Sequence, residues 1–226
     1  MFIIAIKLKF PFLFYRGAIS IVLETASLLI LICFLLFFLY YLSQRKRLYS
    51  MGNDMCLTGL EVAERLTNNA ILSGVEIYQG NLIRGTKVDS DSVTVSREIL
   101  DTRTIGASSE MIFSMAYLIE RYHSGNIFQM EHYSRIKGIL MRLSLTIIVL
   151  GMILLLFTGI TILFVTGSIL IICSAAFTLT AIPFMKRVCN QAFTLTRSYG
   201  LCTAEELPEY KKAYNFYAKR NMLFSF

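Results

Sequence analysis

The sequence predicts an integral membrane protein that is mostly α-helical, with a small β component in a cytoplasmic domain. Of the 226 residues, 55% are hydrophobic and only 16% are charged, whereas soluble domains carry about a quarter charged residues. The apolar residues concentrate in two stretches, residues 18–42 and 139–185, and a polar stretch separates them. We therefore expect one transmembrane helix, an α+β cytoplasmic domain, a transmembrane helical hairpin and C-terminal helices.

The first transmembrane helix is predicted at residues 18–42. Glu24 lies near its outer end, where headgroup water and the helix dipole both favour an anion. Residues 1–17 are apolar but interrupted by lysines and a proline, so we expect them at the membrane interface. The basic segment Ser43–Arg47 follows the span without a small-residue cleavage site, which indicates an anchor that is not cleaved.

The hairpin is predicted from a second apolar stretch that is too long for one span. Residues 143–185 contain no Asp, Glu, Lys, Arg or His. As a single helix this stretch would be about 65 Å long, roughly twice the thickness of the hydrocarbon core. A turn at Gly159 would leave the first arm short, whereas a turn at Val165–Ser168 leaves two arms near spanning length. We therefore predict arms at residues 143–164 and 168–185.

The basic residues predict the orientation. The three segments that would flank the spans on one side are rich in Lys and Arg, and the positive-inside rule assigns that side to the cytoplasm. The N-terminus is then outside, and the polar domain and the C-terminus are cytoplasmic. The cations are Arg45, Lys46 and Arg47, then Arg135, Lys137 and Arg142, then Lys186 and Arg187.

The formal net charge of +7 lies outside the polar domain. Between Arg45 and Lys137, 11 basic residues balance 11 acidic ones, so the excess lies beside the spans and in the tail. This distribution favours contact with anionic lipid headgroups. It lacks the basic face of a nucleic-acid-binding domain, so we predict no nucleic-acid partner.

The polar domain, residues 43–138, is predicted to have the order helix, strand, strand, helix. The first helix begins at a capping box, Thr58–Glu61. Alternating apolar and polar residues predict strands at Gly74–Tyr78 and Ser92–Ser96. The second helix is expected at Arg103–Arg121, where apolar residues recur along one face.

The C-terminal tail, residues 186–226, is predicted to form two helices. Gly200 should end the first, and a second capping box, Thr203–Glu206, should open the other. The terminal helix carries an aromatic stripe among lysines and an arginine. This pattern suits an interfacial amphipathic helix, with packing on the polar domain as the alternative. The stripe comprises Tyr210, Tyr214 and Tyr217.

A set of segments carries a likeness to a known family: Gln44–Ser50, Leu57–Leu66, Val93–Ser96, the hairpin and Gly200–Pro208. Taken together, these segments resemble the bacterial family of membrane-bound neutral zinc metallopeptidases. The likeness runs from about residue 40 to the end, with the same segment order and spacing. It implies a bacterial inner membrane location, a zinc cofactor and a peptidase site on the second helix of the polar domain.

The residues of that zinc site are missing here. The family motif His-Glu-x-x-His places two imidazoles one turn apart to hold zinc, with a glutamate as general base. The matching stretch has Ser109, Glu110 and Phe113 at the three functional positions, and Met185 and Arg187 stand where the family has acidic residues. A further family motif, Asp-His-Tyr-Asp-Pro, is absent as well. We therefore predict no metal ligand and no catalytic residue, with these five positions as a vestigial site.

Two environments remain open for Glu110. It could be an ordinary solvated helix residue, or Arg187 could supply the lost positive charge and pair with it, because a buried unpaired carboxylate is costly. The functional expectation is a non-catalytic pseudopeptidase with a binding or regulatory role, for which the expected partner is another membrane protein. The alternatives are an active membrane metallopeptidase with non-standard ligands and an oligomeric channel or transport component.

Overall fold

The computed structural model describes residues 25, 29, 32–33, 35–68, 72, 74–80, 85–89, 91–123, 136, 138–140, 142–151, 153 and 162–223. Its described residues divide into two compact units. One is drawn from residues 1–40 and 137–176, here called the apolar unit, and the other from residues 41–136 and 177–226, here called the polar unit. The fold is mostly helical with one three-stranded sheet, which agrees with the predicted class. The predicted interfacial segment and Glu24 lie outside the described residues.

The first helix continues past the predicted end of the span at Leu42. Residues 35–50 are helical without a break, so the basic segment lies within the helix. Leu35, Leu36 and Leu39 are each more than half exposed, which is typical of an apolar helix without a protein partner. From residue 41 onward the helix belongs to the polar unit, and Leu48 is buried there.

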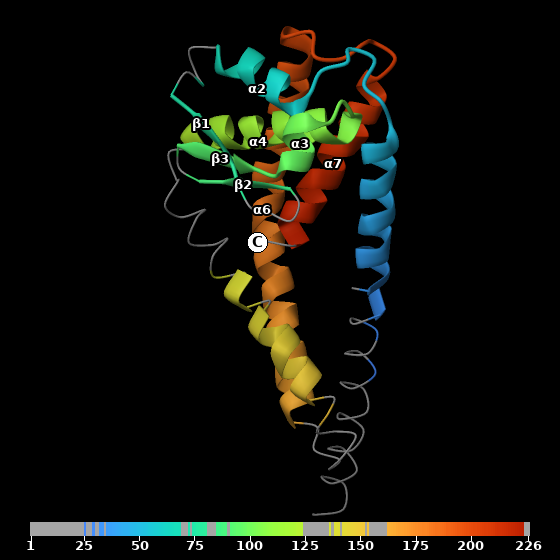
Figure 1. Ribbon diagram of the computed structural model, residues 1–226. Helices are drawn as coiled ribbons and strands as arrows, with labels where there is room; N and C mark the ends of the chain where they lie inside the picture. Colours follow the sequence, from blue (N-terminus) through green and yellow to red (C-terminus); the bar gives the residue numbers. More distant parts are fainter. Residues whose placement is uncertain are drawn as a thin grey trace, which may run out of the picture. The chain divides into compact units, whose positions relative to one another are not determined.

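The polar unit contains more elements than predicted. In chain order they are α2 (Gly59–Thr67), β1 (Glu76–Gln79), β2 (Thr86–Val88), β3 (Ser92–Val95), α3 (Arg97–Asp101) and α4 (Ile105–His123) (Figure 1). The capping box that opens α2 is confirmed, with Thr58 and Glu61 bonded to each other's backbone. The predicted order missed β2 and α3, which are too short for a period to be read from the sequence.

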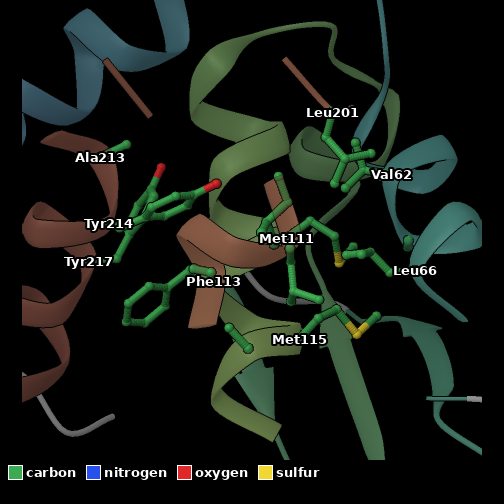
Figure 2. Close-up of a cluster of buried hydrophobic side chains, with 14 of the residues drawn as sticks. Val62, Leu66, Met111, Phe113, Met115, Leu201, Ala213, Tyr214 and Tyr217 are labelled. Atoms are coloured by element: carbon green, nitrogen blue, oxygen red, sulfur yellow. The ribbon is translucent and has the colours of Figure 1, made fainter. Parts of the chain in front are cut away.

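The sheet has the order β1-β3-β2. Strand β1 is parallel to the central β3, and β2 is antiparallel to it. Two β3 residues, Val93 and Val95, are fully buried. Helix α4 packs against α2, α3, α7 and β2, so residues 105–116 of α4 are all buried. Figure 2 shows the methionines Met111 and Met115 of α4 on the side of Leu66 in α2.

Helix α6 (Ile162–Ser198) contradicts the predicted hairpin turn. It runs without a break through Val165–Ser168, so the predicted turn there is wrong. It also continues beyond Met185 into the helix predicted at the start of the tail. Gly159, the other candidate for the turn, lies outside the described residues. Within the part of the chain that the structure describes, one helix is long and apolar enough to cross a membrane, at Val165–Ser198, and its apolar 18-residue window has mean hydropathy 2.0. The helical residues Gly138–Gly151 form a shorter apolar helix.

Gly167 makes a close helix–helix contact inside the apolar unit. A Cβ atom at Gly167 would lie 2.6 Å from Cγ1 of Ile148 and 3.0 Å from its backbone nitrogen. The glycine therefore allows α6 to approach the helix that contains Ile148, as small residues do between packed apolar helices. We predicted a turn at a residue that in fact serves close packing.

The end of α6 confirms the predicted role of Gly200. This residue has φ +57°, the left-handed conformation that favours glycine. Its N–H donates to the Arg197 carbonyl at 3.3 Å, and the Leu201 N–H donates to the Thr196 carbonyl at 3.0 Å. These two bonds form a Schellman motif, which satisfies carbonyls that the helix end would leave free.

The second capping box is also confirmed, and it leads into α7 (Leu207–Leu223). The Glu206 carboxylate accepts from the Thr203 N–H at 3.0 Å, and the Glu206 N–H donates to the Thr203 hydroxyl at 3.3 Å. Pro208 is the second residue of α7, where a missing N–H costs little because first-turn amides have no intrahelical partner.

The aromatic stripe of α7 packs inside the protein. Tyr210, Tyr214 and Tyr217 are 0%, 1% and 0% exposed. Cys189 and Thr178 of α6 donate to α7 carbonyls at 3.5 and 3.2 Å, so α7 lies along α6 as well as α4 (Figure 1). The interfacial prediction for this stripe is therefore wrong. A helical stripe shows that one face needs an apolar neighbour, but it does not distinguish lipid from protein.

Candidate functional site

Glu110 lies in the middle of the buried part of α4. Its side chain is 0% exposed, so the expectation of a solvated helix residue is wrong. Burial of an ionised carboxylate is costly unless cations or donors compensate it. The partners of Glu110 therefore decide what this position can do.

Both carboxylate oxygens of Glu110 have partners. The Tyr49 hydroxyl donates to Oε2 at 2.7 Å, and the Arg220 guanidinium donates to Oε1 through Nη1. Tyr49 belongs to the helix at residues 41–50 and Arg220 to α7. We call Glu110, Tyr49 and Arg220 the carboxylate centre.

The charge states in the centre follow from burial and from Glu110. Burial raises the pKa of Tyr49 well above its usual range, and the negative charge of Glu110 raises it further. Burial lowers the pKa of Arg220, but the charge and hydrogen bond of Glu110 outweigh that effect, so the net pKa is higher than usual. Tyr49 is therefore a neutral donor and Arg220 a permanent cation, which together balance the carboxylate.

A second layer of residues holds the centre in place. The Arg45 guanidinium lies over the Tyr49 ring, 4.6 Å from its centroid, and donates to Glu98 at 2.9 Å. Gly85 closes another side with φ +93°, and a Cβ atom there would lie 3.4 Å from Oε1 of Glu110. The centre is thus bordered by Arg45, which Glu98 of α3 holds, and by the residue before β2.

Gly106, in the first turn of α4, is the contact point for the two flanking helices. A Cβ atom at Gly106 would lie 2.5 Å from the Tyr49 ring, so only glycine leaves room for it. The Tyr217 hydroxyl donates to the Gly106 carbonyl at 2.9 Å. The helix at residues 41–50 and α7 therefore meet α4 at the same turn.

The other predicted positions on α4 carry no free functional group. The Ser109 hydroxyl donates to the carbonyls of Ile105 and of Gly106, in the same helix. Phe113 is 1% exposed, and the centroid of its ring lies 5.9 Å from that of Tyr217. Figure 2 shows these two side chains next to each other. Glu110 is therefore flanked by a serine hydroxyl bonded to its own helix backbone and by a phenyl ring packed in the core.

Met185 and Arg187 do not supply the hydrogen-bond partners of Glu110, which are Tyr49 and Arg220. Met185 is buried in the hydrophobic core, 6% exposed. Arg187 pairs with Glu120 at 3.3 Å, so the predicted pair with Glu110 is wrong. The inference that a buried carboxylate needs a cation was sound, but the cation comes from α7.

Sequence reasoning missed Tyr49 and Arg220. They lie 61 and 110 residues from Glu110 along the chain, and spacing carries no information over such distances. One signal was present: Arg220 lies three residues after Tyr217, so an α7 packed on the domain would bury its aliphatic part too. We gave the membrane interface first and packing on the polar domain as the alternative, and we did not extend that alternative to Arg220.

The residues around Glu110 do not fit zinc. A zinc site needs three or four ligands from His, Cys, Asp or Glu at tetrahedral positions. In the described ranges, no three such side chains gather in one place. His123 is exposed at the end of α4, with Nδ1 2.9 Å from the Ile119 carbonyl, and His132 lies outside those ranges. A serine hydroxyl and a phenyl ring at the family's two histidine positions cannot replace imidazoles.

Comparison with known proteins adds no relative. No family model matches the chain, and neither a curated protein nor a solved structure matches it. A functional assignment must therefore come from the geometry of the carboxylate centre.

Proposed function

We propose that the chain is a membrane-anchored, non-catalytic binding or regulatory protein, similar in layout to zinc metallopeptidases, in which an ion pair stands where those enzymes hold the metal. One observation carries this proposal: both oxygens of Glu110 are engaged, one by Arg220 and one by Tyr49. The resemblance of segment order and of the segments at Leu57–Leu66 and Gly200–Pro208 supports the link to the family.

The chemistry of the centre argues against peptide hydrolysis by the family mechanism. A general base must accept a proton from a water that a metal has activated. Here Glu110 faces a guanidinium and a phenol, and Phe113 packs on Tyr217 rather than offering a lone pair. An arginine cannot give up its proton near neutral pH, so Arg220 acts as a fixed counter-ion.

Exposed apolar residues support a membrane location. On α6, Ile169, Ile172 and Leu179 are at least half exposed, and the leucines at the start of the described first helix are similarly exposed. We place the chain in the bacterial inner membrane, with the N-terminus outside and the polar unit and C-terminus in the cytoplasm. Its partners would be anionic headgroups and another membrane protein, not nucleic acid.

Metal content and hydrolysis test the non-catalytic assignment. The full chain would be purified in detergent, its zinc measured by mass spectrometry and casein cleavage followed. We expect zinc far below stoichiometry, no cleavage, and no change in Glu110→Gln. Glu120→Gln is the matched control, because Glu120 lies on the same helix and pairs with Arg187. Stoichiometric zinc that is lost in Glu110→Gln and kept in Glu120→Gln would overturn the proposal.

Cysteine labelling tests the orientation independently. Cys56 is exposed in the polar unit, so a variant that keeps this cysteine alone can report the side of the membrane. A membrane-impermeant maleimide should label it in inverted inner-membrane vesicles and not in intact spheroplasts. The reverse pattern would place the polar unit outside.

A further inference from the structure

The carboxylate centre joins two helices that lie far apart in the chain. Tyr49 is near the end of the first helix, which is continuous from residue 35 to residue 50. Arg220 lies in the last turns of α7. Each donates to a different oxygen of Glu110, so a single carboxylate holds both helices on α4.

Further contacts place the two helices against each other. The Tyr41 ring stacks on Phe216 of α7, with centroids 5.1 Å apart and an interplanar angle of 10°. Arg220 lies over the Tyr217 ring at 5.1 Å, and Tyr217 in turn bonds to Gly106 beside Tyr49. The three helices thus form a closed set of contacts around Glu110.

We propose that the carboxylate centre is a conformational coupling device, through which displacement of the helix at residues 41–50 loosens the last turns of α7, and displacement of α7 loosens that helix. The physical reason is that Glu110 is fully buried. Removing one donor leaves one carboxylate oxygen of Glu110 buried without a hydrogen bond. The remaining hydrogen bond alone must then offset the free energy needed to keep the carboxylate away from water. A coupling between two sites is reciprocal by thermodynamic linkage.

Through the carboxylate centre, a movement of the helix at residues 41–50 can reach α7 in the C-terminal tail. Because residues 41–50 are helical without a break, a partner or lipid that shifts this helix at Tyr41 also shifts Tyr49. The tail would then respond at Arg220 and its neighbours. This inference does not depend on whether the chain hydrolyses peptides, since it concerns only the contacts of Glu110.

Hydrogen exchange on the full chain in detergent tests the coupling. Tyr49→Phe removes one hydroxyl and keeps the ring. We expect amide exchange in residues 215–223 to rise by about tenfold, the effect of losing one hydrogen bond to a charged group. Tyr122→Phe is the matched control, because its hydroxyl also donates to a carboxylate, that of Asp91, away from the centre. The control should leave α7 unchanged.

The reciprocal variant completes the test. Arg220→Gln should raise exchange in residues 41–50, and Arg220→Lys should do so less because it keeps the charge. If Tyr49→Phe changes exchange only within residues 41–50, the coupling is refuted. It is also refuted if the β3 peptide Ser92–Val95 accelerates by the same factor as α7, because that result means global unfolding.

Discussion

Replacing Arg220 by methionine tests the carboxylate centre most directly. The variant keeps an unbranched side chain of similar length but removes the cation that faces Glu110. Loss of one partner of a buried ion pair costs about 3–5 kcal/mol, because the other charge stays buried and unpaired. Glu110 is 0% exposed, whereas Arg220 is 13% exposed and water could replace part of the guanidinium. We therefore expect a loss near the lower end, about 3 kcal/mol in the free energy of unfolding.

The measurement is thermal unfolding of the full chain in detergent, followed by circular dichroism. For a chain of this length, each kcal/mol shifts the midpoint by about 2–4 °C, so Arg220→Met should melt about 6–12 °C lower. Arg47→Met is the matched control. Its pair with Glu209 spans 3.4 Å and its side chain is 53% exposed, so the loss should stay below about 1 kcal/mol.

A double variant tests whether the unpaired charge of Glu110 causes the loss of stability in Arg220→Met. Glu110→Gln removes the charge but keeps an oxygen that can accept from Tyr49. Combined with Arg220→Met, it should recover at least half of the lost stability, because no buried charge is then left unpaired. The reasoning is refuted if Arg220→Met melts like Arg47→Met, or if the double variant is no more stable than Arg220→Met alone.

Three further predictions concern close packing and a thiol. Gly106→Ala should lower the free energy of unfolding by about 1–3 kcal/mol, because the new Cβ atom would lie 2.5 Å from the Tyr49 ring. This cost should outweigh the better helix propensity of alanine. A variant that is more stable in thermal unfolding would show that Tyr49 lies elsewhere. Gly167→Ala should also lower the melting midpoint, because its Cβ atom would lie 3.0 Å from the backbone nitrogen of Ile148. Gly52→Ala is the control, because a Cβ atom there meets nothing within 4 Å. Equal melting midpoints for the two variants would contradict the close contact at Gly167. Burial and then the charge of Glu206 raise the pKa of Cys202 from 9.0 to about 11, so about one thiol in a thousand is ionised at pH 8. In a variant with Cys202 as its single cysteine, the alkylation rate should rise about fiftyfold from pH 9 to pH 11, because the ionised fraction grows by that factor around a pKa of about 11. A rise of only about twofold, which a thiol with pKa 9.0 would give, would disprove the shift.

The features predicted correctly are those that depend on neighbouring residues. Both capping boxes and the end of α6 at Gly200 follow from bonds between groups within about five positions of each other. Strand β3 and helix α4 carry clear periods and lie close to their predicted bounds. Strand β2 has three residues, which is too few for a pattern.

The predicted hairpin turn shows that composition predicts helices but not the role of a glycine within them. An apolar run without charge predicts helices, but its glycines can serve either turns or close contacts. Gly167 serves a contact with Ile148, and only the position of the neighbouring helix reveals that. The same ambiguity applies to the aromatic stripe of α7, whose partner is protein rather than lipid.

By itself, the sequence determined the helical class, the two capping boxes, the end of α6 at Gly200, the neutral polar segment and the absence of histidines at the positions around Glu110. It also required a cation for Glu110 if that residue were buried. Only the tertiary structure decided that Glu110 is buried and that Arg220 and Tyr49, rather than Arg187, are its partners. The physical reason is that burial and long-range pairing depend on how α7 and the helix at residues 41–50 meet α4, and no local pattern in the chain records that contact.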